Sequence, residues 1–446
     1  MGDPSESKIE PQAGIATHKP WQAWLRPRPL GVLIVAMLLL GVFLRVHAFG
    51  DPDSFLFDEH HFVENARNYL QHRPDWNDHP PLGKLIIAEA IEMLGDSSVG
   101  WRMPSLIFGI ATILFGGLAS RRLFKSVIAG WLAAAFLSVD GFLISYARAA
   151  LLDGYLAACL AIALFIATLP MSFGAVLAAG LITGFSASIK FSGIAVLLPF
   201  LLMVAFANIP RKKLAIYGLT FVMAMVGVYV SQYSRGLMLA MQPASPLDVF
   251  KDTQRLLDHH AALTDMKNPW TSGWVTWALP TKPVLLRYAQ HMGEVRVLSG
   301  LGNLALWWPG ILVTVAAIAS ILAKGVIAIV GPVSDDLDTS PSVSVSAFVQ
   351  ARGRSVLLLL SGCIGFLAPW VVTHRDSYIY HFLPCYLAIV LLLAGCVDWV
   401  RKRKPLEALI FVGVVLVVAA FYAPVWSSMA ISAKAVQARL FLGSWR

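Results

Sequence analysis

The chain alternates between long apolar blocks and short polar segments. The block Leu30–Ala48 holds one charged residue, Arg45, and the block Leu406–Ala423 holds one, Glu407. A run of roughly 17–25 apolar residues crosses a bilayer as a helix, because a helix satisfies its backbone hydrogen bonds without water. The pattern predicts an all-α polytopic membrane protein with eleven spans, at residues 30–48, 101–119, 127–144, 152–169, 173–189, 192–209, 214–233, 303–323, 355–373, 378–397 and 406–425.

Composition agrees with this pattern. Of the 446 residues 57% are hydrophobic and 14% charged, with a mean hydropathy of +0.68, whereas a soluble domain carries about 25% charged residues. The first block is not expected to be a cleaved signal peptide, because a polar segment, residues 1–29, precedes it and many spans follow. The four cysteines show no paired spacing, so neither a metal site nor a disulfide is predicted.

Basic residues mark one side of the predicted membrane protein. They cluster around Arg26, Arg121, Arg211, Arg352 and Arg401, and each cluster falls on the same side of the spans. By the positive-inside rule this side is cytoplasmic, so the net charge of +9 reports topology and not a nucleic-acid partner. The predicted layout is a disordered cytoplasmic tail (1–29), a transmembrane catalytic domain (30–425) and an outer C-terminal tail (426–446). The catalytic domain contains two long outer loops, 49–100 and 234–302, and a flexible cytoplasmic loop, 325–354.

The first outer loop contains a dense group of titratable side chains. After Asp58 and Glu59, apolar residues recur at helical spacing, at Phe62, Ala66, Tyr69 and Leu70. This spacing predicts an amphipathic helix at the membrane surface with Asp58 at its N-cap, where the helix dipole favours a carboxylate. Either Asp58 is only a cap and Glu59 only a first-turn acid, or Asp58 is a general base within reach of a reacting hydroxyl.

A histidine and two prolines stand later in the same loop. Pro80 and Pro81 restrict the backbone and fix where the next amphipathic helix starts, which pins His79 just before it. A structural and a catalytic role for His79 both fit this pattern.

Further polar residues lie at the outer ends of the spans. Ionisable groups at membrane depth are costly, which makes them candidates for function. Lys190 and Arg375 have a second interpretation, in which their long side chains reach out to lipid headgroups. Outward-facing cations in apolar walls are, however, what an anionic lipid phosphate requires. The residues at these ends are Tyr146, Arg148, Asp153, Lys190, Arg375, Asp376, Tyr380 and His381.

A metal site is a weaker alternative. The first outer loop holds several potential ligands, and Asp51-Pro52-Asp53 resembles a DxD motif, with His60 and His61 nearby. Adjacent residues rarely point at one ion, and acid-rich loops are often only solvated. No cofactor is therefore favoured, and a divalent cation is kept as the lesser alternative.

Taken in order along the chain, these motifs resemble the protein O-mannosyltransferase family, the dolichyl- or polyprenyl-phosphate-mannose-dependent enzymes of the GT-C class. The family's FDE-x-HF element is similar to Phe57–Phe62 and its HPPL-x-K element to His79–Lys84. Five further motifs of the family are similar to segments that follow in the same order along this chain: Trp101–Ser105, Arg148–Asp153, Lys190–Gly193, Gly302–Trp308 and Tyr380–Pro384.

The resemblance implies an inverting transfer of mannose from a polyprenyl-phosphate carrier to Ser or Thr hydroxyls of a translocated polypeptide. Asp58 would be the base, and Glu59 would orient the acceptor or Asp58. Arg148, Lys190 and Arg375 would neutralise the phosphate of the donor. Because a phosphate departs as an anion, no general acid of the glycosidase kind is needed. The expected supporting residues are His61, His79, Asp153, Asn303, Trp307, Tyr380 and His381.

The lengths of the outer loops and the predicted topology indicate which members of this family the chain resembles and where it is located. Eukaryotic members carry a large soluble domain in the late outer loop, and 234–302 is too short for it, so the chain resembles the compact bacterial members. The expected location is the inner (plasma) membrane, with a cytoplasmic N-terminus and an extracytoplasmic active site. Two alternatives remain: a related transferase with a lipid acceptor such as lipid A, and a transporter of a lipid-linked sugar. A transporter is expected to show repeats and midplane ionisable residues, whereas here the ionisable residues lie at outer span ends.

Overall fold

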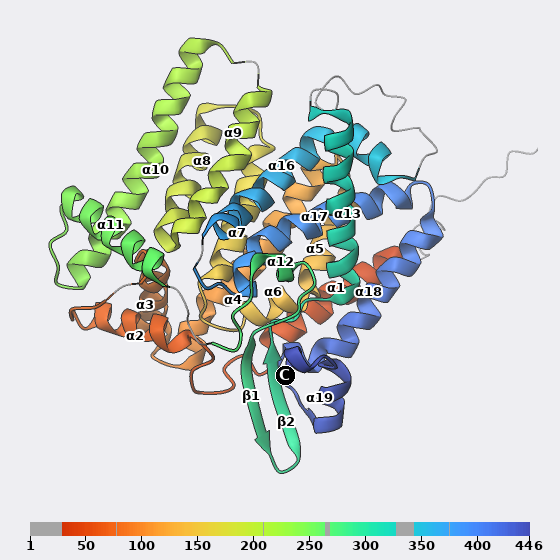
Figure 1. Cartoon of the computed structure of the whole chain (residues 1–446), viewed down its shortest axis with the longest axis horizontal. Helices are drawn as coiled ribbons and strands as arrows, with labels where there is room; N and C mark the ends of the chain where they lie inside the picture. The colour runs from red at the N-terminus through yellow and green to blue at the C-terminus, as the bar shows by residue number, and fades with distance from the viewer. Residues whose placement is uncertain (1–28, 77, 208, 264–267, 327–342, 374) are drawn as a thin grey trace, which may run out of the picture.

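The computed structural model describes residues 29–76, 78–207, 209–263, 268–326, 343–373 and 375–446. All but the last residue of the predicted cytoplasmic tail, and most of the predicted 325–354 loop, lie outside the described residues. The described chain is a bundle of long helices with small elements gathered at one end (Figure 1).

Each of the eleven predicted spans coincides with an apolar helix, which confirms a multi-pass helical membrane protein. Four of these helices are short: α5 (Val127–Ser138), α7 (Asp153–Ala167), α8 (Phe173–Ile189) and η2 with α9 (Phe191–Phe206). The number of spans therefore stays a prediction. Within the described part of the chain, seven helices are long and apolar enough to cross a bilayer: α1 (Pro29–Val46), α4 (Ser98–Leu123), α10 (Arg211–Leu239), α13 (Leu304–Lys324), α16 (Val345–Val372), η3 with α17 (Ile379–Arg401) and α18 (Pro405–Trp426).

The core lies around α17, which runs through the middle of the bundle (Figure 1). Its apolar window is 94% buried, and it packs against α5, α7, α13, α16 and α18. The predicted span 127–144 is interrupted, because α5 ends at Ser138 and Asp140 then caps a separate helix, α6 (Gly141–Tyr146). The same carboxylate accepts hydrogen bonds from Asn303 N at 2.9 Å and from Tyr386 Oη at 2.8 Å, which ties α6 to α13 and α17.

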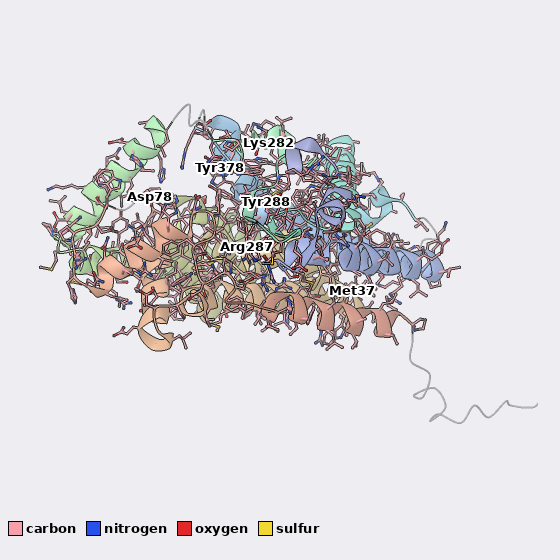
Figure 2. All side chains as sticks on the ribbon, turned by 90° about the horizontal axis from the view of Figure 1, so that it is seen from below. Met37, Asp78, Lys282, Arg287, Tyr288 and Tyr378 are labelled. Carbon is pink, nitrogen blue, oxygen red and sulfur yellow. A yellow bond between two sulfur atoms is a disulfide. The ribbon has the colours of Figure 1, made fainter. Side chains whose placement is uncertain are left out.

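The end of the bundle that the charge pattern predicts to be extracytoplasmic is called the outer end here, and Figure 2 views the molecule from it. The predicted surface helices are present there as α2 (Glu59–Leu70) and α3 (Leu82–Leu94). The strands β1 (Leu285–His291), β2 (Glu294–Ser299) and β3 (Ala430–Ser432) form an antiparallel sheet that the sequence pattern did not predict. The remaining elements there are α11 (Pro246–Ala262), α12 (Trp274–Trp277), α19 (Ala433–Arg439) and η4 (Gly443–Trp445).

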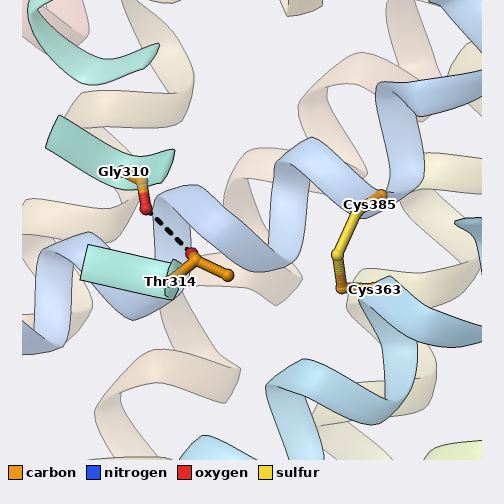
Figure 3. The surroundings of a disulfide bond; sticks show 4 residues. All are labelled: Gly310, Thr314, Cys363 and Cys385. Atoms are coloured by element: carbon orange, nitrogen blue, oxygen red, sulfur yellow. Dashed lines mark hydrogen bonds between the residues drawn. A yellow bond between two sulfur atoms is a disulfide. The ribbon is translucent and has the colours of Figure 1, made fainter. Parts of the chain in front are cut away.

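One pair of cysteines differs from the prediction made from the sequence. Cys363 of α16 and Cys385 of α17 are joined by a disulfide bond (Figure 3), although no disulfide was predicted. The two residues are 22 positions apart and meet because their helices pack side by side, which linear spacing does not reveal. Cys159 and Cys396 are buried and free. Figure 3 also shows Thr314 donating to the carbonyl of Gly310 within α13, at 2.8 Å.

Candidate active site

A cavity of about 370 Å³ opens at the outer end, and we call it the polar cavity. The first outer loop, the start of α7, the end of α8 and the segment before α17 form its walls. Its volume is typical of small-molecule sites. In Figure 2, Asp78 and Tyr378 mark two of these walls. Eight of the twelve predicted site residues line it: Asp58, His61, His79, Asp153, Lys190, Arg375, Tyr380 and His381.

Asp58 stands at the N-cap position of α2, as predicted, but its side chain makes no capping hydrogen bond. Among the described residues no donor reaches its carboxylate, which lines the polar cavity. Burial raises the pKa of Asp58 above the ordinary value, while His61 and Lys190 act in the opposite direction. A carboxylate that is free of structural partners and raised in pKa is suited to accept a proton. The geometry thus favours the general-base interpretation over the cap.

Glu59 does not line the polar cavity, so of its two predicted roles, orienting the acceptor or orienting Asp58, its position fits the second. Its side chain is 0% exposed and paired with Arg102 at 2.8 Å. Its two oxygens also accept hydrogen bonds from the main-chain N–H of Leu56 at 2.7 Å and of Ala150 at 2.8 Å. Glu59 therefore joins the first outer loop to α4 and to the segment before α7, and it positions Asp58 through the backbone.

Arg148, predicted to neutralise the donor phosphate, also does not line the polar cavity. The residue is 2% exposed and donates to the carbonyls of Leu44 at 2.8 Å and Arg45 at 2.9 Å. The last carbonyls of a helix have no partner within the helix and attract cations. Arg148 therefore anchors the end of α1 and carries a structural charge.

Asn303 and Trp307 are the other two predicted residues that the structure separates from the polar cavity. Asn303 caps α13 and donates to the carbonyls of Val139 and Val415. Trp307 stacks on Tyr386 with ring centroids 4.2 Å apart and donates to the carbonyl of Ala278. Both side chains are fully buried, so their motif reflects helix packing.

Two cations do reach the polar cavity. Lys190, the C-cap of α8, is 6% exposed and pairs within the protein with Asp153 at 2.8 Å. Arg375 is half-buried, and the structure shows no hydrogen bond or ion pair from its guanidinium to any described residue. Burial lowers the pKa of Arg375, yet the group stays cationic at neutral pH because arginine starts so high.

A second cavity of about 380 Å³ adjoins the first, and we call it the apolar cavity. Both are lined by His79, Lys190, Arg375 and His381, so these residues form a shared wall. The arrangement places cations where a polar chamber meets an apolar one, as an amphiphile with an anionic head requires. Most other residues of the apolar cavity carry no charge: Phe191, Ser192, Ile194, Leu257, Ala261, Gly365, Pro369, Trp370 and Thr373.

His79 of the shared wall and His260 of the apolar cavity are held by ring and main-chain contacts. His79 stacks between Phe62 and His260, at 6.1 and 5.2 Å, and Lys84 donates to its carbonyl at 2.7 Å. Burial lowers the pKa of His79 well below the ordinary value and that of His260 to about 4, so both rings are neutral at pH 7. Lys84 and His260 were missed as site residues. Lys84 carried a signal in the HPPL-x-K element, whereas His260 had none beyond the adjacent His259.

The predicted metal alternative lacks a ligand set among the described residues, where no three His, Cys, Asp or Glu side chains form a group able to hold an ion. Asp51 of the DxD-like segment lies outside the lining of both cavities and pairs with Arg287 at 2.7 Å. That hydrogen bond holds the pKa of Asp51 below its ordinary value.

Comparison with known families decides the class of protein. Two models described as dolichyl-phosphate-mannose-protein mannosyltransferase match residues 35–98 and 78–231. A third, described as the C-terminal four-transmembrane region of protein O-mannosyltransferase, matches residues 248–445. The chain belongs to the protein O-mannosyltransferase family.

Relatives within the protein O-mannosyltransferase family match along most of the chain. The polyprenol-phosphate-mannose–protein mannosyltransferase of Mycobacterium tuberculosis is 23% identical over 93% of this chain and 91% of its own length. The solved protein O-mannosyltransferase Pmt1–Pmt2 complex of S. cerevisiae, bound to the sugar donor, superposes with a TM-score of 0.78 at 13% identity and covers 95% of this chain and 93% of that chain. ArnT of Cupriavidus metallidurans bound to undecaprenyl phosphate gives 0.53 at 17% identity, over 85% of this chain and 62% of that chain. At these identities the structural likeness shows the shared GT-C fold.

Proposed function

We propose that this protein O-mannosyltransferase moves mannose from a polyprenyl-phosphate carrier to Ser or Thr hydroxyls of a polypeptide, with inversion at the anomeric carbon. The observation that carries the proposal is the junction of the two cavities. Asp58, whose carboxylate has no hydrogen-bond partner among the described residues, lines the polar cavity together with two cations, Lys190 and Arg375, and both cations also line the apolar cavity. The names of the relatives supply the sugar and the protein acceptor.

The two cavities suit the two ends of such a donor. The polyprenyl chain would occupy the apolar cavity beside Ile194, Leu257 and Trp370. The phosphate would lie at the shared wall against Lys190 and Arg375, and the mannose would project into the polar cavity toward Asp58. Apolar surface then meets apolar ligand, and each charge meets its opposite.

Asp58 acts as the general base in the proposed reaction. It takes the proton of the acceptor hydroxyl while the hydroxyl oxygen attacks the anomeric carbon from the side opposite the phosphate. The bond from that carbon to the phosphate oxygen breaks, and its electron pair leaves with the phosphate. Lys190 and Arg375 stabilise the charge that grows there. The proton ends on Asp58, and the products are the mannosylated polypeptide and polyprenyl phosphate.

A transfer assay tests this function. Membranes containing the protein are incubated with labelled polyprenyl-phosphate-mannose and a Ser/Thr-rich peptide, with and without a chelator. Asp58→Asn is expected to lower transfer by about 100-fold or more, since general-base catalysis contributes roughly 10²–10⁴-fold. Asp53→Asn is the matched control, because Asp53 is an exposed carboxylate of the same loop outside both cavities. Normal transfer by Asp58→Asn, or no transfer by the wild type, overturns the proposal.

We further propose that the protein lies in the inner membrane with its N-terminus in the cytoplasm and the polar cavity outside. The basic clusters, which the positive-inside rule places in the cytoplasm, support this orientation. Labelling single cysteines in intact cells with a membrane-impermeant thiol reagent tests it, with one site in β1–β2 and one beside Arg211. Labelling of the Arg211 site alone contradicts the orientation.

A further inference from the structure

The ion pair between Asp153 and Lys190 occupies the place that the proposed reaction gives to the donor phosphate. The Lys190 ammonium donates to Asp153 Oδ2 at 2.8 Å, and the two side chains are 8% and 7% exposed. Asp153 is the first residue of α7 and Lys190 is the C-cap residue of α8. Because these two helices pack against each other, they fix the positions of both residues. Lys190 therefore already has an anionic partner within the protein.

The overall charge of the polar cavity sharpens this point. Its lining holds three carboxylates, Asp58, Asp78 and Asp153, and two cations, Lys190 and Arg375. Counting these acidic and basic side chains alone, the lining carries a formal charge of −1. A cavity built only to hold a phosphate tightly would carry a positive charge, because buried charges need opposite partners.

We propose that Asp153 competes with the lipid phosphate for Lys190 and thereby promotes release of the product, an inference that rests on the proposed function. Lys190 has three N–H donors, so it can turn toward the phosphate or bridge phosphate and carboxylate. In either case the Asp153 carboxylate lies next to a second anion in a poorly solvated place. Asp153 is thus a positioning residue that lowers the affinity for anions.

Because the phosphate gains negative charge during the reaction, Asp153 is expected to weaken the binding of the product more than that of the donor. The donor is a phosphodiester with one negative charge, whereas polyprenyl phosphate is a monoester whose second ionisation has a pKa of about 6. During transfer Asp58 becomes neutral by taking the proton, and the phosphate gains the charge. Repulsion from Asp153 therefore acts on up to two charges in the product and on one in the donor. The ion pair disfavours the product more than the substrate.

A simpler role for Asp153 makes the opposite prediction. If Asp153 only orients Lys190 for the phosphate, its removal weakens the binding of donor and product alike. If Asp153 competes with the phosphate, its removal strengthens binding, and more for the monoester than for the diester.

The test measures binding of two probes to the purified protein in detergent: undecaprenyl phosphate and its methyl phosphodiester. Asp153→Asn is expected to bind the monoester roughly tenfold or more tightly than the wild type, with a smaller gain for the diester. Asp153→Glu, which keeps the charge, is expected to bind like the wild type. Asp398→Asn is the matched control, because Asp398 is a buried acid paired with Arg401 at 2.8 Å and lies outside both cavities.

Unchanged or weaker binding of the monoester by Asp153→Asn overturns the inference while leaving the proposed function intact. Equal gains for both probes overturn the directional part, which is the promotion of product release. If the wild type binds neither probe, the donor site itself fails, and the inference fails with it. Gel filtration and thermal unfolding check that the variant is folded, and Asp153→Ser provides a second neutral side chain if asparagine is not tolerated.

Discussion

Replacing Glu59 with glutamine separates a structural role for this residue from a chemical one. The substitution leaves the Arg102 guanidinium, which is 0% exposed, without its carboxylate. Removing one partner of a buried pair costs about 3–5 kcal/mol. Arg102 keeps two carbonyl partners, Pro52 at 2.9 Å and Ser54 at 2.7 Å, so the low end of that range applies.

The glutamine also turns one oxygen into an amide group. Either Leu56 N or Ala150 N then loses its acceptor, at a cost of about 1–3 kcal/mol for a buried donor. We therefore expect Glu59→Gln to lower the free energy of unfolding by about 4 kcal/mol or more. Adding Arg102→Met removes the second charge and is expected to restore part of this loss.

Thermal and urea unfolding in detergent, together with turnover per folded molecule, measure the effect. Glu64→Gln is the matched control, because Glu64 forms an exposed pair with Arg67 and such pairs contribute roughly 1 kcal/mol or less. A Glu59→Gln protein of unchanged stability that has lost its turnover would refute this reasoning. That result would indicate that Glu59 takes part in the chemical step of the transfer.

Other substitutions and conditions separate the remaining roles. Arg375→Met is expected to raise the KM for the lipid donor roughly tenfold or more with an unchanged melting temperature, since Arg375 contacts the cavities and no described structural partner. Arg148→Met is expected to lower the melting temperature and the yield and to leave the KM for the lipid donor unchanged, because it leaves the carbonyls of Leu44 and Arg45 without a donor. Equal KM changes in the two variants contradict the structural role of Arg148 and the donor-binding role of Arg375. Because burial raises the pKa of Asp58, kcat/KM is expected to fall as pH drops through a value above 3.8, the ordinary pKa of this carboxyl, and an acid limb at or below 3.8 contradicts the buried base.

Much of the fold follows from the sequence because the bilayer leaves few choices. A run of apolar residues such as Leu406–Ala423 must form a helix, so positions of spans follow from hydropathy alone. The same constraint brings Asp58, Asp153 and Lys190 to one end of the bundle, where the structure joins them in one cavity. What hydropathy misses is the sheet of β1, β2 and β3, which forms outside the spans.

The roles of charged residues were harder to predict, because the sequence around a charged residue does not show which hydrogen-bond or ion-pair partner it has in the fold. Arg148 finds its acceptors at Leu44, 104 positions earlier in the chain, and Arg102 finds Glu59 at a separation of 43. Neither distance leaves a local pattern. Lys190 and Arg148 therefore carried equal weight in the sequence, and only the fold directs one into the cavity and the other into a helix end.

The wall shared by the two cavities limits how this enzyme can be redesigned. His79, Lys190, Arg375 and His381 belong to both, so a substitution among them alters the proposed lipid site and the proposed transfer site at once. A variant library aimed at new acceptor sequences is better placed at residues that line the polar cavity alone, Phe57, Asn268 and Tyr378. One aimed at shorter or longer lipid carriers belongs at Ile194, Leu257 and Gly365, which line the apolar cavity alone. The two specificities can then be selected in separate rounds and combined.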